Sequence, residues 1–265
     1  MMSLAGSRYA AGVEYDGSQF HGWQYQCGQS SVQEVVESAL SYVADHPIRV
    51  IAAGRTDTGV HGIGQVIHFD SAQPRSLRAW LRGTNTRLPT GVTLSWVQPV
   101  DLKFHARYSA IARSYRYVLC NRTVRPTYLS PLVAWDYRTF NLTRMRSAAQ
   151  TLLGRHDFSA YRAASCQAHS PVRELRRLDV QQLDGWIWFD LLADAFLQRM
   201  VRNIVGVLLA IGAGEKEVGW AESVLQSRDR TQGGITAPAA GLYLVNAIYP
   251  DTYTGIPRMN PCRFW

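Results

Sequence analysis

Lysine is nearly absent from this chain of 265 residues, in which Lys103 and Lys216 are the only two. The 28 basic residues are therefore almost all arginines, and with 20 acidic residues the formal net charge is +8. A positive surface attracts polyanions, and the guanidinium group binds phosphate in a bidentate manner. Charge alone leaves two interpretations open, a nucleic-acid-binding protein and an ordinary, mildly basic one whose GC-rich genome favours arginine.

Cysteine is also scarce. The four cysteines are Cys27, Cys120, Cys166 and Cys262. None of them forms a C-x-x-C pair, and the seven histidines are scattered without the spacing of a zinc site. We therefore expect free thiols in a reducing compartment and no bound metal.

Long apolar runs are missing too, since no stretch of about 18 uninterrupted apolar residues occurs, the length that a membrane-spanning helix needs. The first residues, 1–11, lack the apolar core of a signal peptide. Apolar residues nevertheless make up 46% of the chain, which is enough for a packed core. We expect a folded, cytoplasmic protein.

The common nucleotide and hydrolase motifs are absent. There is no Walker A sequence and no G-x-S-x-G elbow. Gly212-Ala213-Gly214 resembles the start of a dinucleotide fingerprint, but Glu217 stands where the third glycine belongs. These glycines also follow a predicted helix instead of a strand, so ATP, NAD and serine-hydrolase chemistry are all disfavoured.

The first part of the chain predicts the order strand, helix, strand, strand, helix, strand. Ser31 and Glu34 form a capping box at the start of the first helix. The predicted elements are 8–15, 31–44, 48–53, 64–70, 76–86 and 92–97.

The second part repeats a similar order. Asn141 is a helix cap, and Asp184-Gly185 is a strong hairpin signal. The predicted elements are strands 111–120, 172–183, 186–192 and 242–249, and helices 142–153, 196–211 and 217–226. We therefore expect an α+β fold of two ferredoxin-like (βαββαβ) halves, 1–109 and 110–265. Their strands would form an extended mixed, mostly antiparallel sheet with helices on one side, and the second half would complete an active-site cleft.

One short loop has the residues for chemistry. Arg55 and Asp57 lie between Gly54 and Gly59, where glycine lets a substrate approach the backbone closely. A nearby arginine keeps a carboxylate ionised, and an ionised carboxylate in a cleft can act as nucleophile, base or electrostatic stabiliser. The residues alone leave a simpler alternative open, in which Asp57 or Thr56 only caps a turn.

Six blocks of the sequence resemble the bacterial tRNA pseudouridine synthase I (TruA) family, in the family's order and along nearly the whole chain. The loop around Asp57 resembles the catalytic motif of that family, with Thr58 and Gly62 where alanine is more usual. The blocks are 15–24, 31–33, 53–61, 104–107 with 113–117, 156–158 with 196–206, and 237–244.

The resemblance implies roles for four residues. Asp57 would be the catalytic nucleophile, Arg55 would help to hold a flipped nucleotide, Tyr115 would pack on the target base, and Arg202 would face the aspartate. The residues by themselves favour more ordinary roles, with Tyr115 in the core and Arg199 and Arg202 as a solvated or phosphate-binding pair on one helix face.

The resemblance also implies a reaction, the isomerisation of uridine to pseudouridine at positions 38, 39 and 40 in the anticodon stem-loop of tRNA. It further implies a homodimer that grips the tRNA elbow. The reaction breaks the N1–C1′ bond and rejoins the base through C5 without redox change, so no cofactor is expected. Arg8, Arg75, Arg78 and Arg82 are candidates for phosphate contacts, although each is equally explained as a solvated charge.

Two other classes of function remain open. A non-catalytic RNA-binding protein would use the same basic surface but would not need Asp57. An enzyme acting on small glycosides would normally need a second carboxylate in the pocket, and the loop around Asp57 contains none; Asp70 lies outside it. The tail 251–265 is either a lightly ordered extension or a subunit contact.

Overall fold

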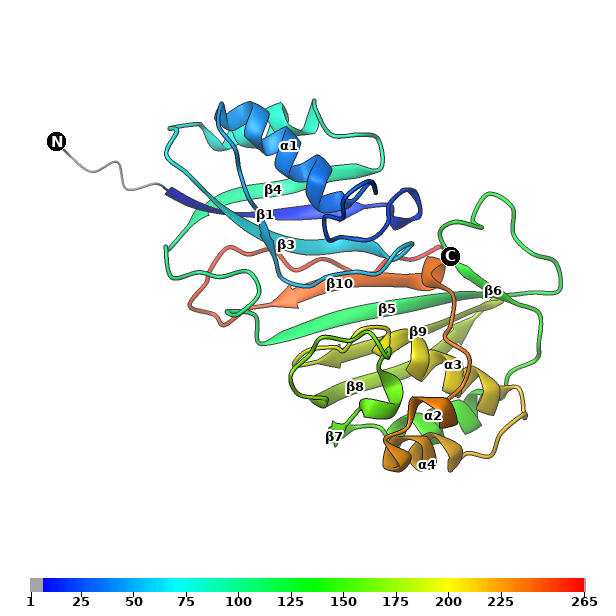
Figure 1. Cartoon of the computed structure of the whole chain (residues 1–265). Helices are drawn as coiled ribbons and strands as arrows, with labels where there is room; N and C mark the ends of the chain where they lie inside the picture. Colours follow the sequence, from blue (N-terminus) through cyan, green and yellow to red (C-terminus); the bar gives the residue numbers. More distant parts are fainter. Residues whose placement is uncertain (1–6, 265) are drawn as a thin grey trace. The chain divides into compact units, whose positions relative to one another are not determined.

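The computed structural model describes residues 7–264 and divides into two compact units. The first unit comprises Met1–Ile111 and Leu244–Pro261, and the second comprises Ala112–Tyr243 and the end of the chain (Figure 1). Residues 1–6 lie outside the described part, and they belong to the segment 1–11 in which no signal peptide is expected. Trp265, the last residue of the tail 251–265, lies outside it as well.

The sheet of the first unit is built around β1 (Ser7–Tyr15). This strand pairs in antiparallel fashion with β3 (His61–Ser71) on one side and with β4 (Val92–Val100) on the other. The short strand β2 (Ile51–Ala52) also pairs with β3, and β10 (Leu242–Ile248) follows β3 in the strand order. The loop after β2 therefore leads into β3, which pairs with β1 from Gly62 to Ser71.

Helix α1 (Val32–Ala44) covers one face of this sheet (Figure 1). Its cap is the predicted one, since the Ser31 side chain accepts a hydrogen bond from the amide of Glu34 at 3.3 Å. The helix ends at Asp45, which takes the left-handed conformation with φ 58°. The core beneath it contains the fully buried rings of Phe69 and Trp80, and burying each such side chain stabilises the fold by about 2–3 kcal/mol.

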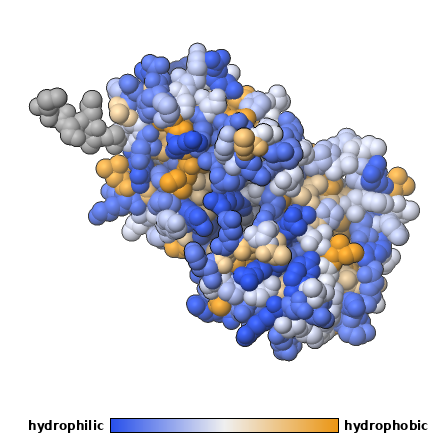
Figure 2. Space-filling model, viewed as in Figure 1, coloured by the Kyte–Doolittle hydropathy of each residue, from blue (hydrophilic) through white to orange (hydrophobic). Residues whose placement is uncertain are grey.

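The two faces of β1 belong to different clusters, as the two-residue period of a strand requires. Tyr9 and Ala11 pack toward α1, whereas Ala10 belongs to a second buried cluster with Phe104 and Tyr249. A helical segment beside α1 includes the π-helix η2 (Ala79–Gly83) inside the helix predicted over 76–86, and it buries Trp80. On the face drawn in Figure 2, hydrophobic residues appear as scattered spots.

The sheet of the second unit has the order β5, β9, β8, β7. These strands are antiparallel to their neighbours, and a short strand β6 pairs in parallel with β5. Their bounds are β5 (Ala112–Asn121), β6 (Ala134–Asp136), β7 (Gly154–Asp157), β8 (Val172–Leu183) and β9 (Trp186–Ala193). The predicted hairpin is confirmed, since Asp184 and Gly185 both have positive φ, 45° and 80°.

Three helices accompany this sheet: α2 (Leu142–Gln150), α3 (Met200–Gly212) and α4 (Trp220–Ser227). The predicted helix 196–211 begins four residues too early, because Arg199 takes the left-handed conformation with φ 61° and precedes α3. Arg199 therefore does not share a helix face with Arg202, and that prediction is wrong. The α+β class with mostly antiparallel strands is confirmed.

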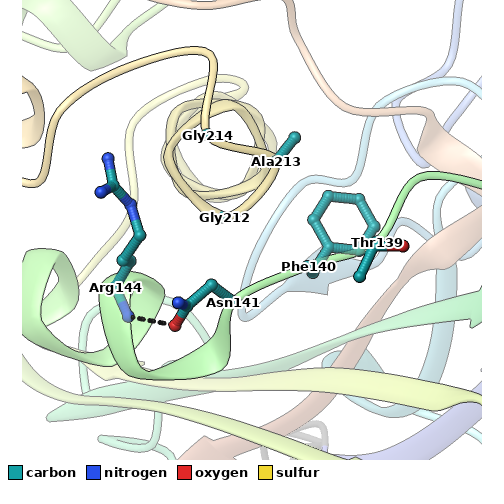
Figure 3. A pocket seen from close by; sticks show the side chains of 7 residues that line it. All are labelled: Thr139, Phe140, Asn141, Arg144, Gly212, Ala213 and Gly214. Atoms are coloured by element: carbon teal, nitrogen blue, oxygen red, sulfur yellow. Dashed lines mark hydrogen bonds between the residues drawn. The ribbon is translucent and has the colours of Figure 1, made fainter.

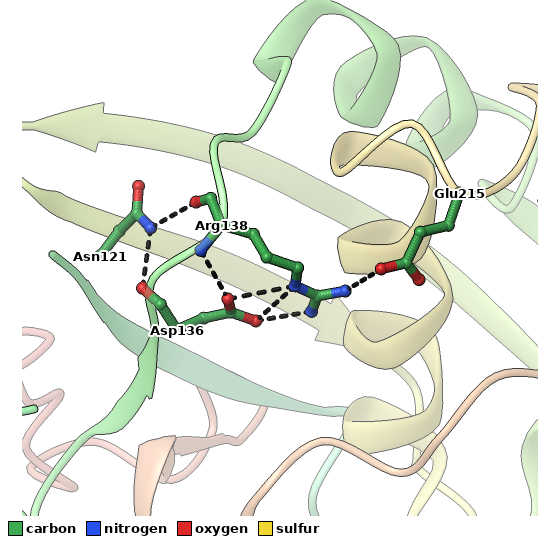
Figure 4. Close-up of polar contacts among 4 residues, drawn as sticks. All are labelled: Asn121, Asp136, Arg138 and Glu215. Atoms are coloured by element: carbon green, nitrogen blue, oxygen red, sulfur yellow. Dashed lines mark hydrogen bonds and ion pairs between the residues drawn. The ribbon is translucent and has the colours of Figure 1, made fainter. Parts of the chain in front are cut away.

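Strands β6 and β7 were not predicted, since each has only three or four residues. Arg138 fastens the end of β6, as Figure 4 shows. Its guanidinium donates to Asp136 at 2.5–3.1 Å and to Glu215 at 2.5 Å, while the Asn121 amide donates to the carbonyl oxygens of Asp136 and Arg138. This network ties β5 and β6 to the segment after α3.

The predicted strand 48–53 shortens to Ile51–Ala52. The amide of Val50 does not join a ladder but donates to the buried carboxylate of Glu37 on α1, at 3.0 Å. The Arg49 side chain binds the same carboxylate at 2.8 Å. The chain thus enters the loop after β2 from a fixed point on α1.

Candidate functional site

The loop 53–61 starts on the flank of β3. The amide of Ala53 donates to the carbonyl oxygen of Val66 at 2.8 Å. The Gln65 side chain then binds both backbone groups of Gly54, accepting from its amide at 3.3 Å and donating to its carbonyl oxygen at 2.6 Å. Because Gln65 is fully buried, these two hydrogen bonds fix where the loop departs from the sheet.

A tight turn places Asp57. The amide of Val60 donates to the carbonyl oxygen of Asp57 at 3.1 Å, and Gly59 has φ 77°. A positive φ at the third residue is the mark of a type II turn and favours glycine there. Asp57 is half-buried at the head of this turn, between the buried Thr56 and the exposed Thr58.

The segment 15–24 cradles the loop from the other side. The amide of Trp23 donates to the carbonyl oxygen of Thr56 at 3.0 Å, and the Tyr15 and Thr56 hydroxyls are 2.9 Å apart. Gly22 has φ 87°, and a Cβ there would lie 2.6 Å from the carbonyl oxygen of Thr56. Only glycine satisfies both conditions, since a side chain would be strained and would also collide.

The far end of the loop is fixed by His61, which is 1% exposed. Its Nδ1 accepts a hydrogen bond from the amide of Gly17 at 3.1 Å, and an Asp16 carboxylate oxygen lies 3.2 Å from the same nitrogen. A Cβ on Gly17 would lie 2.0 Å from the carbonyl oxygen of Val60, so the two segments are in backbone contact. The turn that carries Asp57 is therefore restrained at both ends.

The first unit holds Arg55 and Asp57 on this one loop. The ion pair that their spacing suggests does not form, because the exposed Arg55 makes no salt bridge with any of residues 7–264. Arg55 faces solvent, whereas Asp57 is half-buried. The guanidinium is thus presented outward from the loop.

The second unit holds the other two predicted residues. Tyr115 lies on β5 opposite Leu191, is 8% exposed, and packs edge-on against Phe196 with ring centroids 5.0 Å apart. Arg202 lies in the first turn of α3, and its Nε donates to the carbonyl oxygen of Ala237 at 2.7 Å. This bond fixes the plane of the Arg202 guanidinium.

Asn203 and Gly206, which lie in the same block 196–206 as Arg202, hold a second segment against α3. The Asn203 side-chain oxygen accepts from Arg230 at 3.1 Å and from the Thr236 hydroxyl at 2.7 Å. A Cβ on Gly206 would lie 1.9 Å from the carbonyl oxygen of Ile235. The segment 230–237 therefore lies directly on α3, and its Ala237 carbonyl reaches Arg202.

The four arginines considered for phosphate contacts differ in their surroundings. Arg8 forms a bidentate salt bridge with Asp70 at 2.7 and 2.8 Å and also donates to two backbone carbonyl oxygens, so it ties the unit together. Arg75 donates to the carbonyl oxygen of Val43 at 3.0 Å. Arg78 and Arg82 are exposed on the helical segment beside α1.

Sequence reasoning missed the supporting residues of the site. Tyr15, Gly17, Gly22, Gln65 and Asn203 bear no reactive group, so no chemical pattern singled them out. Four of them stand in blocks that resemble the family, and their place in those blocks was the available signal.

The second unit also has a surface hollow of about 550 Å³. It lies where the start of α2 meets the end of α3 (Figure 3). Its lining is Thr139, Phe140, Asn141, Arg144, Gly212, Ala213 and Gly214. Arg144 donates to the carbonyl oxygens of Ile211 and Lys216, and none of the four predicted site residues lines the hollow.

Within residues 7–264, no group of three histidine, cysteine, aspartate or glutamate side chains is placed to hold a metal ion. Over the same residues, no helix combines the length and the apolar character needed to cross a membrane.

The fold and the loop define a class of protein, an arginine-rich α+β protein that holds a carboxylate in a restrained, glycine-bounded turn. The family model described as tRNA pseudouridine synthase matches residues 11–109 and 148–250. The tRNA pseudouridine synthase A of Nitrosococcus oceani is 51% identical over 259 residues, covering 97% of this chain and all of that protein. Its counterpart in Hydrogenovibrio crunogenus is 49% identical over 250 residues, covering 94% and 95%.

The chain therefore belongs to the tRNA pseudouridine synthase family. A pseudouridine synthase is an isomerase, and the family implies an RNA substrate. Among solved structures, a Cbf5-Nop10-Gar1 complex matches with a TM-score of 0.36 and 11% identity, over 76% of this chain and 45% of that one.

Proposed function

We propose that this protein converts uridine to pseudouridine at positions 38, 39 and 40 in the anticodon stem-loop of tRNA, with Asp57 as the nucleophile. The family gives the reaction class. The observation that carries the assignment to Asp57 is its position at the head of a turn that β3 and the segment 15–24 restrain at both ends. A carboxylate that only capped a surface turn would not need such a support.

In this proposal the target base leaves its stack, at a cost of a few kcal/mol. The exposed Arg55 occupies the vacated space, and the ring of Tyr115 stacks on the base. Arg202 keeps the Asp57 carboxylate ionised, since a nearby guanidinium lowers the pKa of a carboxyl group. The N1–C1′ bond breaks, the base turns and the C5–C1′ bond forms. C5 loses its proton and N1 gains one from water, so the product is an isomer of the substrate.

The proposal includes the division of labour expected from the sequence, with residues 1–109 carrying the catalytic loop and residues 110–265 completing the cleft. It also includes a homodimer, a cytoplasmic location and independence from cofactors. The resemblance of the six blocks supports each of these, and the isomerisation itself requires no external electron donor or acceptor.

The test is tritium release from tRNA that carries [5-³H]uridine. The wild type and Thr58→Ala, which changes the exposed neighbour of Asp57, should both release tritium. Asp57→Asn should bind the same tRNA and release none. Release from Asp57→Asn at the wild-type rate would contradict the assignment of the nucleophile.

A second substrate tests the position. A tRNA transcript with cytidine at positions 38, 39 and 40 should give no release while remaining a competitive inhibitor. Undiminished release from that transcript would show that the enzyme modifies another part of the tRNA, with the reaction class intact.

A further inference from the structure

Tyr108 is among the most exposed aromatic side chains of the protein, with 76% of its surface accessible. It follows Arg107 in a stretch of strongly biased charge. Within the first unit, residues 71–111 include six basic residues and a single acidic one, Asp101. A partner that binds here is therefore expected to be anionic.

The Tyr108 ring is held in one orientation in spite of its exposure. It stacks on the imidazole of His105 with centroids 4.3 Å apart and planes inclined by 29°. His105 is fixed in turn, because its Nδ1 accepts hydrogen bonds from the amides of Arg107 and Tyr108 at 3.2 and 3.1 Å. The Ser109 hydroxyl and amide close the same turn onto the backbone of His105.

This turn is anchored to the sheet by a second imidazole. The amide of Ala106 donates to Nδ1 of the buried His68 on β3 at 3.0 Å, and the Tyr249 hydroxyl donates to the carbonyl oxygen of Ala106 at 2.7 Å. Accepting these bonds requires unprotonated Nδ1 atoms. Burial, together with the charge of Arg8, lowers the pKa of both His68 and His105 and so keeps them neutral.

The turn and the catalytic loop share one buried cluster. Ala53, the first residue of the loop, packs in that cluster with Phe104 and Ala106. At most about 14 Å of chain separates Ala53 from Asp57, and about 7 Å separates Ala106 from Tyr108. A few nucleotides of an RNA chain are enough to bridge from one position to the other.

We propose that Tyr108 is a stacking platform for an unpaired base of the RNA substrate, outside the position of the reacting uridine. The inference rests on the proposed function for its substrate. A ring that is exposed, oriented in advance and flanked by a guanidinium suits a nucleobase, because every base offers a π-face and brings an anionic backbone. The Arg107 guanidinium, 5.6 Å from the centre of the ring, flanks the platform.

The experiment separates stacking from other uses of the ring. Binding of unmodified tRNA and tritium release are measured for Tyr108→Ala, Tyr108→Leu and Tyr108→Phe, with Tyr128→Ala as the matched control, since Tyr128 is 79% exposed. Loss of the ring in the alanine and leucine variants should weaken tRNA binding about 5- to 100-fold, mainly through KM. Tyr108→Phe and Tyr128→Ala should stay within about twofold of the wild type, and thermal unfolding should be unchanged throughout.

Three outcomes would overturn the platform. Tyr108→Ala could bind tRNA as tightly as Tyr128→Ala. Tyr108→Leu could retain full affinity, which would indicate an apolar contact without stacking. Tyr108→Ala could alter the oligomeric state while leaving tRNA affinity unchanged, which would assign the ring to a second copy of the chain. The role of Asp57 is tested by tritium release, whereas the role of Tyr108 is tested by tRNA affinity. A wrong proposed function can therefore be distinguished from a wrong assignment of Tyr108.

Discussion

The phenolic oxygen of Tyr15 lies 2.9 Å from the hydroxyl oxygen of Thr56, and both side chains are buried. Tyr15 is the last residue of β1, and Thr56 directly precedes Asp57. This single hydrogen bond therefore connects the central strand of the first unit to the loop that contains Asp57. It makes the position of Asp57 depend on a residue 41 positions before Thr56.

We predict that removing either hydroxyl lowers the free energy of unfolding. Removing both should lower it by less than the sum of the two single losses. Thr56→Val keeps the shape of the side chain but removes the Thr56 hydroxyl from this hydrogen bond, and Tyr15→Phe removes the Tyr15 hydroxyl from it. A buried hydroxyl that loses its partner costs about 1–3 kcal/mol, whereas replacing both partners by apolar groups is nearly neutral. Urea denaturation of the two single variants and the double variant measures this coupling, and strictly additive losses would contradict it.

Gly22 provides a second prediction, with Gly28 as its control. Both have positive φ, 87° and 75°, so at each position an alanine in this left-handed conformation lowers the free energy of unfolding by about 1–2 kcal/mol. A Cβ at Gly28 meets nothing within 4 Å, but one at Gly22 would lie 2.6 Å from the carbonyl oxygen of Thr56. Gly22→Ala should therefore lose a further 1–3 kcal/mol or so, and most of its turnover, because the loop must shift. Equal unfolding free energies and equal activities for the two variants would refute the close contact.

Local signals in the sequence were enough to locate most of the fold. The Ser31 cap, the Asn141 cap and the Asp184-Gly185 hairpin all depend on residues within three positions of one another. Hydrophobic periodicity located α1, since its buried positions recur every three or four residues. For the same reason the α+β class was predictable, and so was the loop that contains Asp57.

Other features depend on contacts between distant parts of the chain and were not predictable. Val50 leaves the expected strand because its amide binds Glu37, thirteen residues earlier. Arg199 precedes α3 because its backbone is left-handed, a conformation that nothing in the arginine side chain signals. The resemblance pointed to the segment 15–24, but only the structure explains it, as the cradle of the loop around Asp57.

At Gly206, helix propensity and packing predict opposite effects of an alanine on stability. Alanine is a better helix former than glycine by about 1 kcal/mol, so helix propensity predicts that Gly206→Ala stabilises α3. A Cβ there would lie 1.9 Å from the carbonyl oxygen of Ile235, so packing predicts the reverse, and at that distance packing dominates. The variant should lose roughly 1–2 kcal/mol of unfolding free energy.

The same substitution should lower kcat, because the displaced segment 230–237 carries the Ala237 carbonyl that orients Arg202. Gly219→Ala is the control, since φ there is −68° and a Cβ would meet nothing within 4 Å. That variant should stay within about 1 kcal/mol of the wild type and keep its turnover. A stabilised and fully active Gly206→Ala enzyme would mean that the segment 230–237 does not lie against α3 as described.

The buried imidazole of His68 predicts how stability varies with pH. Burial, Arg8 and His105 lower its pKa from the ordinary value of 6.5 to about 4, so the unfolded chain binds a proton in this range that the native state does not. Stability should therefore rise from pH 4 to pH 6.5 and level off above, with His68 contributing roughly 3 kcal/mol of that change. In His68→Gln the amide oxygen can still accept from Ala106 but cannot titrate, so subtracting its stability curve from that of the wild type removes the carboxylate contributions common to both. A difference that stays constant from pH 4 to pH 6.5 would show that His68 is protonated as readily in the native state as in the unfolded chain.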